Sequence, residues 1–392
     1  MNEKSVYPIP VAVPVNDPIM MLPPPIAPPI DTNCDGRCQS MKQIDDTQLD
    51  ALRDQGFTTG LARSLFTNAR TFPLRIWIID NSGSMSTCDG HRLVETSSRK
   101  EPIKMASCTR WREIQQTVEY HVRMAGLLRA PTTFRLLNDP GLGAGHREFS
   151  ICKRGDDMIP QDIQQAHDIM HQSTPQGATP LTRHINEIRD DIVAMQPYLA
   201  REGKKVAVII ATDGLPTDEY GSDGPAQRRE FVDAIRSLER LPIWVVIRLC
   251  TDDDHVVEFY NELDSQLEMS VEVLDDFVGE AKEVQNYNRW LNYTLPLHRC
   301  REMGFYHRLF DLLDERKLTR SELREFCRLL FGEESCDGVP DPEGDWNGFM
   351  ADVKVMLGGE KMQYDPIKGD MRPVIDVYNM DYDYGEGGCV IL

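Results

Sequence analysis

Short, continuous apolar runs recur through the middle of the chain and are separated by longer amphipathic stretches. The clearest runs lie at residues 74–80, 205–211 and 243–249. Strands that are buried on both faces of a parallel sheet show this continuous pattern, and the helices that connect them cover the two faces. The pattern therefore predicts an α/β fold with a doubly wound, mostly parallel sheet over residues 71–290.

Weaker periodic segments complete this predicted domain. Two short strands are expected at residues 133–137 and 147–152, with a glycine-rich turn between them, and a more polar strand is expected at 269–274. That turn resembles a phosphate-binding loop, but no helix follows it, which favours a simple hairpin. Helical spacing of apolar residues predicts helices at 111–128, 161–171, 181–199, 225–240, 254–267 and 276–287.

The segments before this domain have a different composition. Residues 1–44 are rich in proline, which interrupts both helices and strands, so we expect an extended, disordered arm. Residues 45–70 carry apolar positions at helical spacing around Gly56 and predict a helical hairpin packed on the domain that follows. The hairpin resembles the first two helices of a ubiquitin-associated domain, but the third helix is missing.

The segments after the domain predict a small helical module and a tail. The module covers residues 296–358, and Thr319 with Glu322 form a capping box at the start of one of its helices. We expect an irregular acidic tail at 359–392, because it is rich in Gly, Asp and Tyr. Within the module, the pattern predicts helices at 298–317, 322–331 and 346–357.

Charge and cysteine usage limit the possible functions. The 392 residues include 43 Lys and Arg against 63 Asp and Glu, a net charge of −20, which disfavours binding to nucleic acid. No apolar run is long enough to cross a bilayer, and no secretory signal is evident. Ten scattered cysteines fit reduced thiols better than a disulfide framework. We therefore expect a cytoplasmic protein.

Oxygen-bearing side chains follow two of the buried runs and open a helix between them. Ligands of open parallel sheets bind at the carboxyl ends of the strands, where such side chains would meet. Carboxylates and hydroxyls without histidine or thiolate suit Mg²⁺ or Mn²⁺ rather than zinc. The candidate ligands are Asp80, Ser82 and Ser84 after the first run, Thr179 in the loop, and Asp213 after the second run.

These three segments together resemble the von Willebrand factor A domain and its metal-ion-dependent adhesion site. The resemblance rests on Asp-x-Ser-x-Ser at 80–84, Gly-x-Thr-Pro at 177–180 and Thr-Asp-Gly at 212–214, and covers about residues 70–290. It implies that the serines and the threonine contact the metal directly and that the aspartates act directly or through water. It also implies that an acidic residue of a partner protein completes the shell. All five positions are present, so the site is expected to bind metal.

Two features of this resemblance leave alternatives open. Thr174 and Thr182 also lie near the second loop, although Thr179 matches the motif best. The first helix of the family normally starts soon after the serines, whereas here a polar insert intervenes at residues 86–110. We expect this insert to form a loop that overhangs the metal face and selects ligands. Its polar side chains include Asp89, His91 and Glu95.

Other candidate metal sites are weaker. A single Cys-x₃-Cys pair, Cys34 and Cys38, lacks the second pair that a zinc site needs. His167 and His171 are spaced to share one helix face and could bind metal, but no third ligand is evident, so a solvated face is favoured. A haloacid dehalogenase mechanism needs Asp-x-Asp, and Ser82 occupies the second position.

The last four residues, Cys-Val-Ile-Leu, form a prenylation box in which leucine favours a geranylgeranyl group on Cys389. One prenyl chain anchors a protein only weakly, and the acidic tail around it would be repelled by an anionic membrane. We therefore expect weak or partner-assisted association with the cytosolic face of a membrane.

The main hypothesis from the sequence is a scaffold or adaptor, not an enzyme, that binds the Asp or Glu of a protein partner through Mg²⁺ or Mn²⁺. A Mg²⁺-dependent hydrolase is the first alternative, with His91 as a candidate base. An adaptor in ubiquitin handling is the second and depends only on the incomplete helical pattern before residue 70.

Overall fold

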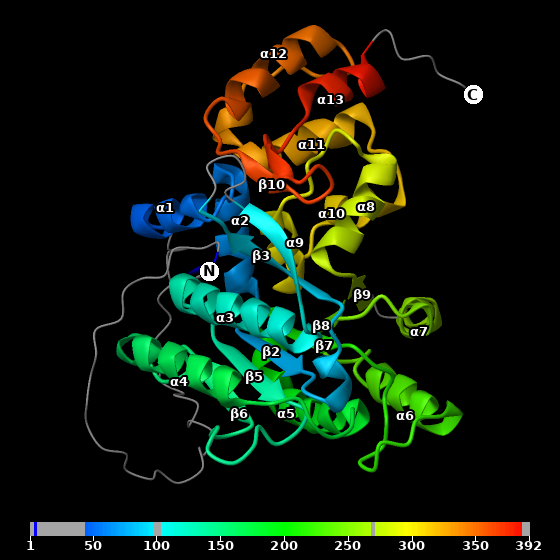
Figure 1. Ribbon diagram of the computed structural model, residues 1–392. Helices are drawn as coiled ribbons and strands as arrows, with labels where there is room; N and C mark the ends of the chain where they lie inside the picture. The colour runs from blue at the N-terminus through cyan, green and yellow to red at the C-terminus, as the bar shows by residue number, and fades with distance from the viewer. Residues whose placement is uncertain (1–3, 6–43, 98–102, 268–270, 386–392) are drawn as a thin grey trace.

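A six-stranded sheet forms the centre of the computed structural model (Figure 1), which describes residues 4–5, 44–97, 103–267 and 271–385. All neighbouring strands are parallel except the antiparallel pair at the β6 edge. The predicted α/β fold with a mostly parallel sheet is therefore confirmed. The strand order is β6 (Glu148–Ile151), β5 (Thr132–Leu136), β2 (Leu74–Ile79), β7 (Val206–Thr212), β8 (Ile243–Leu249) and β9 (Val271–Leu274).

Helices cover both faces of this sheet, as a doubly wound fold requires. Strands β2, β7 and β8 are buried along their whole length, which explains their continuous apolar sequences. Side chains on one face pack against α3 (Arg110–Leu128) and α4 (Ile159–Gln172). Those on the other face pack against α5 (Leu181–Glu202), α6 (Pro225–Arg236) and α7 (Asp254–Gln266).

A second core lies beyond the sheet and is built from helices distant in sequence (Figure 1). The hairpin of α1 (Asp46–Asp54) and α2 (Thr59–Thr71) belongs to it and packs closely on α11, as well as on α3. The hairpin therefore packs on the central domain, as expected, and also on helices of the second core. The other helices of this core are α8 (Phe277–Tyr287), α9 (Leu295–Glu302), α10 (Arg308–Glu315), α11 (Arg320–Phe331), α12 (Trp346–Leu357) and α13 (Val377–Tyr384).

Two predictions for the C-terminal part are wrong. The single helix expected at 298–317 is two helices, α9 and α10, because the chain turns at Gly304 with φ of +76°. The tail is not irregular throughout. It forms an antiparallel hairpin, β10 (Gln363–Asp365) with β11 (Asp370–Arg372), followed by α13.

The insert after the serines is also more regular than expected. Instead of a loop, it forms an antiparallel pair, β3 (Gly90–Glu95) with β4 (Ile103–Cys108), and β1 (Lys4–Ser5) adds to the edge of β3. Residues 1–3 and 6–43 of the N-terminal arm lie outside the described residues, as do Cys34 and Cys38 within it and Cys389 near the C-terminus. In the part of the chain that the structure describes, no helix combines the length and the hydropathy that a membrane span needs.

A buried ionic network joins the second core to the sheet. Glu302, at the end of α9, accepts a hydrogen bond from Arg299 Nη1 (2.5 Å) and pairs with His121 Nε2 of α3 (2.9 Å). Arg248 of β8 lies 3.5 Å from the other oxygen of Glu302 and also pairs with Glu113 of α3. Burial alone would raise the pKa of Glu302, but the surrounding cations hold it well below its usual range.

The contact between α2 and α11 leads to a prediction about stability. A methyl group on Gly60 would lie 2.2 Å from the backbone nitrogen of Gly332, so Gly60→Ala has to separate the two helices. We expect the free energy of unfolding to fall by about 1–3 kcal/mol, although alanine is intrinsically the better helix former. Urea denaturation measures the change. Gly359→Ala, where the new methyl meets only ordinary contacts, is the control, and an increase in stability for Gly60→Ala would contradict this packing.

Candidate metal centre

The register of the central strands brings the two candidate carboxylates to one edge of the sheet. Ile79 of β2 is paired with Ala211 of β7, and the backbone nitrogen of Asp80 donates to the carbonyl of Ala211 (2.8 Å). Asp80 and Asp213 therefore leave adjacent strands at the same level. Strand order reverses at β2, whose neighbours β5 and β7 lie on opposite sides. This is the switch point at which open α/β sheets bind ligands.

The loop after β2 holds its side chains through short hydrogen bonds. Asp80 accepts from the backbone nitrogen of Ser82 through Oδ1 (2.8 Å) and from the hydroxyl of Thr212 through Oδ2 (2.6 Å). The hydroxyls of Ser82 and Ser84 lie 3.0 Å apart. The hydroxyl of Ser84 then donates to Asp213 Oδ1 (2.8 Å). The chain of hydroxyls thus runs from one strand end to the next.

The second loop lies against both of these segments. Gly83 donates its backbone N–H to the carbonyl of Gly177 (3.2 Å). A methyl group built on Gly214 would be 3.7 Å from the hydroxyl oxygen of Thr179, which places that oxygen close to the residue that follows Asp213. Of the alternatives, Thr174 is exposed and Thr182 lies in the first turn of α5. The structure therefore brings Thr179 together with the other four predicted site residues.

Burial of two neighbouring carboxylates is the main electrostatic feature of this edge. The side chains of Asp80 and Asp213 are almost fully shielded from water. Burial, together with the charge of Asp213, raises the pKa of Asp80 to about 6. Burial also raises the pKa of Asp213, although hydrogen bonds from Arg110 and Ser84 oppose this shift. Both carboxylates would gain from an additional cation between them.

Arg110, which the sequence analysis missed, is a cation already present at this edge. It is the first residue of α3, and its Nη1 lies 3.0 Å from Asp213 Oδ2. Its remaining nitrogens bind both oxygens of Asp89 (2.7 and 2.5 Å). The insert thus reaches the site through Asp89, whereas His91 pairs with Asp276 at 4.0 Å. The sequence gives no signal for this role, because a single basic residue at the start of a helix is common and Arg110 belongs to no recognisable motif.

The donor set fits a hard divalent cation. It consists of two carboxylates and three hydroxyls, which is the oxygen chemistry that Mg²⁺ and Mn²⁺ prefer. Arg110 binds only Oδ2 of Asp213, so Oδ1 still faces Ser84 and the rest of the hydroxyl chain. Arg110 is shared between Asp213 and Asp89, so no cation among the described contacts pairs with Asp80. These observations favour a metal at this edge.

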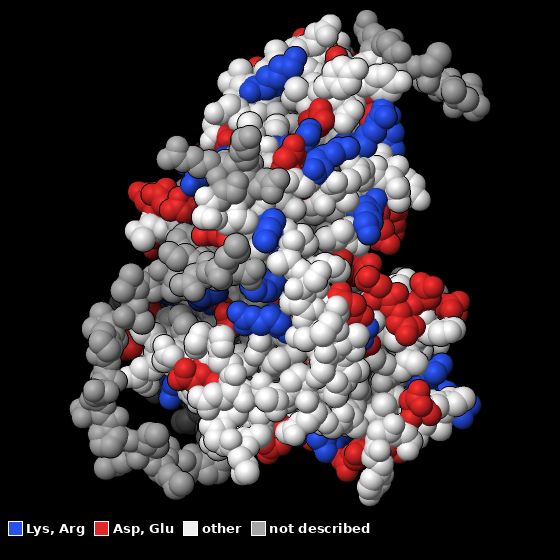
Figure 2. All heavy atoms as spheres, in the orientation of Figure 1, with Lys and Arg blue, Asp and Glu red and all other residues white. Residues whose placement is uncertain are grey.

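Further carboxylates surround the candidate centre. Figure 2 shows acidic side chains gathered over α7 and the loop that leads into it. This loop follows β8, the neighbour of β7, and Asp252 and Asp253 in it are exposed, as is Asp254 at the start of α7. The pKa of Asp252 is raised by partial burial and by Asp276. Without a bound cation, this edge would repel an acidic ligand.

Comparisons with known proteins do not identify a family. No family model matches the chain, and no curated protein matches it either. Among solved structures, a point mutant of the PilB minor pilin from Streptococcus sanguinis is similar over 52% of this chain and 56% of the pilin chain, with a TM-score of 0.33 and 12% identity. The N-terminal domain of TFIIH p34 is similar over 51% of this chain and 90% of its own, with a TM-score of 0.32 and 10% identity.

The raised pKa of Asp80 leads to a prediction about pH. Its folded value, about 6, lies above the ordinary 3.8, so the folded protein binds this proton more tightly than the unfolded chain. The contribution of Asp80 to the free energy of unfolding therefore falls by up to about 3 kcal/mol as pH rises from about 4 to about 6. Without metal, we expect Asp80→Asn to be more stable than the wild type at pH 7.

Urea denaturation in EDTA at pH 7 and pH 4 checks this prediction, because the gain should vanish at the lower pH. Asp190→Asn, on an exposed surface of α5, is the control for a generic loss of charge. A less stable Asp80→Asn variant, or an equal gain in stability at both pH values, would show that ionised Asp80 does not lower the stability of the metal-free protein.

Proposed function

We propose that this chain is a divalent-metal-dependent protein-binding protein with an adhesion site of the von Willebrand factor A type. The hydroxyl chain from Ser82 through Ser84 to Asp213, beside the buried Asp80, is the observation that carries the proposal. Thr179 would supply a third hydroxyl from the neighbouring loop. These residues would hold Mg²⁺ or Mn²⁺ at the switch point of the sheet.

A bound metal would supply positive charge at the point where a partner's Asp or Glu docks. A metal is needed to bind an acidic partner, because the edge of the sheet around the site is itself acidic and repels carboxylates. The serine and threonine hydroxyls are neutral ligands, so the metal would keep more positive charge for the partner than an all-carboxylate site would leave.

Binding is favoured over catalysis by the position of the candidate base. A hydrolase mechanism would depend on His91, which pairs with Asp276. Among the described residues, no hydrogen bond or ion pair joins His91 to Asp80 or Asp213. As a scaffold or adaptor, the protein would present its partner near a membrane if Cys389 carries a prenyl group, as its sequence context predicts.

A capture experiment with the full chain tests the proposed function. We expect proteins retained from a cell extract in Mg²⁺ to be released by EDTA and not to be retained by Ser84→Ala. Ser86→Ala removes an exposed hydroxyl from the same short helical turn and should retain them like the wild type. Retention that persists equally in EDTA and in Ser84→Ala would contradict a metal-dependent mechanism.

Arg110 leads to a prediction about metal affinity. Its guanidinium binds Asp213, one of the candidate ligands, so its positive charge should weaken the binding of a metal there. We expect Arg110→Met to tighten the binding of Mn²⁺ by roughly three- to tenfold. Calorimetry of the full chain measures the affinity.

Arg112→Met, in the same first turn of α3, is the matched control, because Arg112 contacts Gln115 and Glu119 instead of the site. Affinity that stays unchanged or falls in Arg110→Met would show that the guanidinium helps to organise the site rather than competing with the metal.

A further inference from the structure

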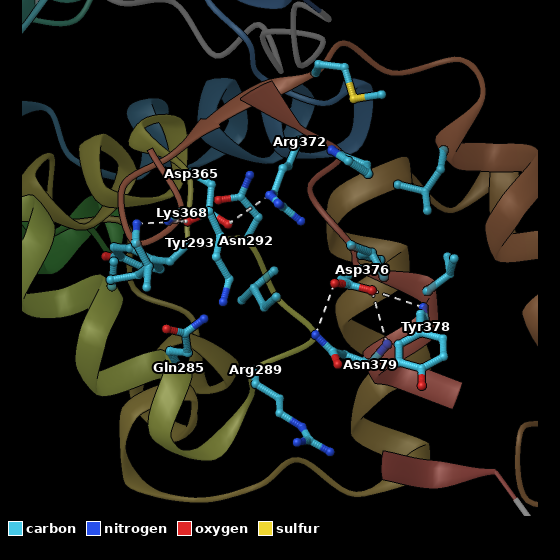
Figure 3. A pocket seen from close by; sticks show the side chains of 18 of the residues that line it. Gln285, Arg289, Asn292, Tyr293, Asp365, Lys368, Arg372, Asp376, Tyr378 and Asn379 are labelled. Atoms are coloured by element: carbon cyan, nitrogen blue, oxygen red, sulfur yellow. Dashed lines mark hydrogen bonds and ion pairs between the residues drawn. The ribbon is translucent and has the colours of Figure 1, made fainter. Parts of the chain in front are cut away.

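A cavity of about 440 Å³ lies in the second core, separate from the five candidate metal ligands. It opens to solvent and is lined by α8, the segment at 289–293, the end of α12, the β10–β11 hairpin and the start of α13. Figure 3 shows Asn292, Asp365 and Lys368 on one side of it and Tyr378 and Asn379 on the other. The volume is within the range of small-molecule sites.

Asn292 supplies the polar group that points to a ligand. Its side chain lines the cavity and is only 6% exposed, yet neither Oδ1 nor Nδ2 has a hydrogen-bond partner. The backbone is held firmly, because Asn292 N donates to the carbonyl of Val374 (3.0 Å). Buried amides in folded proteins are almost always hydrogen-bonded, so this one is suited to a ligand that both donates and accepts.

The charges around the cavity are unusual for so acidic a protein. Four cationic side chains line it, of which Arg289 pairs with Asp383 and Arg372 with Asp370, and its two carboxylates accept hydrogen bonds from the backbone. Asp365 accepts backbone N–H groups in the hairpin turn, and Asp376 caps α13. Within the described part of the chain, no ion pair is found for Lys354 or Lys368. The four cations are Arg289, Lys354, Lys368 and Arg372.

We propose that this cavity binds a small organic anion with an apolar body. Leucine, isoleucine, valine and proline side chains form part of the wall and would cover the body. Lys354 and Lys368 would pair with the anionic group, and the Asn292 amide would bind a polar substituent. This inference does not depend on the metal site.

Direct titration of the full chain tests it with three probes: naphthalene-1-sulfonate, 1-naphthyl phosphate and decanoate. We expect at least one to bind, and the Lys354→Met/Lys368→Met variant to bind it at least about tenfold more weakly. Both lysines are exposed, so the variant should fold, and Lys205→Met, outside the cavity, should bind normally. Binding of none of the probes, equal binding by the double variant, or equal binding of neutral 1-naphthalenemethanol would overturn the proposal.

A second, independent observation concerns the histidine pair on α4. His167 and His171 lie with ring centroids 4.1 Å apart, and His171 Nε2 is 2.9 Å from Glu119 Oε1 on the neighbouring helix α3. Ligand atoms of all three residues lie within 4.8 Å of one another. The third ligand that the sequence did not reveal is therefore provided by helix packing.

We propose that His167, His171 and Glu119 form a zinc site that links α3 to α4, with water completing a tetrahedral shell. Two imidazoles and one carboxylate suit Zn²⁺ better than Mg²⁺, so this site differs in chemistry from the oxygen-only centre. Arg112, with its Nη1 3.7 Å from Glu119 Oε1, would have to move away from that carboxylate on zinc binding.

Calorimetric titration with Zn²⁺ in excess Mg²⁺ tests this site. All proteins carry Cys34→Ser and Cys38→Ser, which removes another pair of candidate zinc ligands. We expect one zinc per chain, lost in His167→Ala/His171→Ala and kept in His146→Ala, an exposed control. Zinc binding that is retained in Asp80→Asn would show that this site is independent of the candidate metal centre at Asp80. No stoichiometric zinc, or equal binding by the histidine variant, would overturn the site.

Discussion

Two carboxylates buried on adjacent strands, Asp80 and Asp213, are the constraint on which the candidate centre depends. Their pairing is costly, because neither is well solvated and the charge of Asp213 opposes ionisation of Asp80. Hydroxyls from Ser84 and Thr212 and the guanidinium of Arg110 offset part of that cost. A divalent cation would offset the rest, so the same feature that lowers the stability of the metal-free protein would provide metal affinity.

Contacts of the second core with the central domain connect the C-terminal helices to the sheet that carries the candidate metal centre. Glu302 of α9 is buried among His121, Arg299 and Arg248, which come from α3, α9 itself and β8. Such a network holds its members in one arrangement, because separating them would leave buried charges unpaired. Helix α3 contributes to this network and also begins at Arg110, so one helix connects the second core with the candidate metal centre.

The sheet, and the placement of the five candidate ligands at one edge of it, could be predicted because their signals are local. Buried strands are continuously apolar, and short motifs at their ends place oxygen atoms at one edge. The errors arose where distant contacts decide the structure. Ile375 pairs with Leu291 and helps to order a tail that has no strong local pattern. Gly304 interrupts an otherwise helical stretch. Arg110 shares no motif with the metal ligands, so only the folded structure shows that it pairs with Asp213.

The central claim is that these carboxylates and hydroxyls form a divalent-metal site, and titration of the full chain with Mn²⁺, followed by electron paramagnetic resonance, tests it most directly. We expect one bound Mn²⁺ in the wild type, displaced by Mg²⁺ and lost in Asp80→Asn/Asp213→Asn. We also expect that Asp252→Asn/Asp253→Asn, which neutralises the exposed acidic loop nearby, retains this ion. Equal binding of Mn²⁺ by the wild type and the Asp80→Asn/Asp213→Asn variant would contradict the claim.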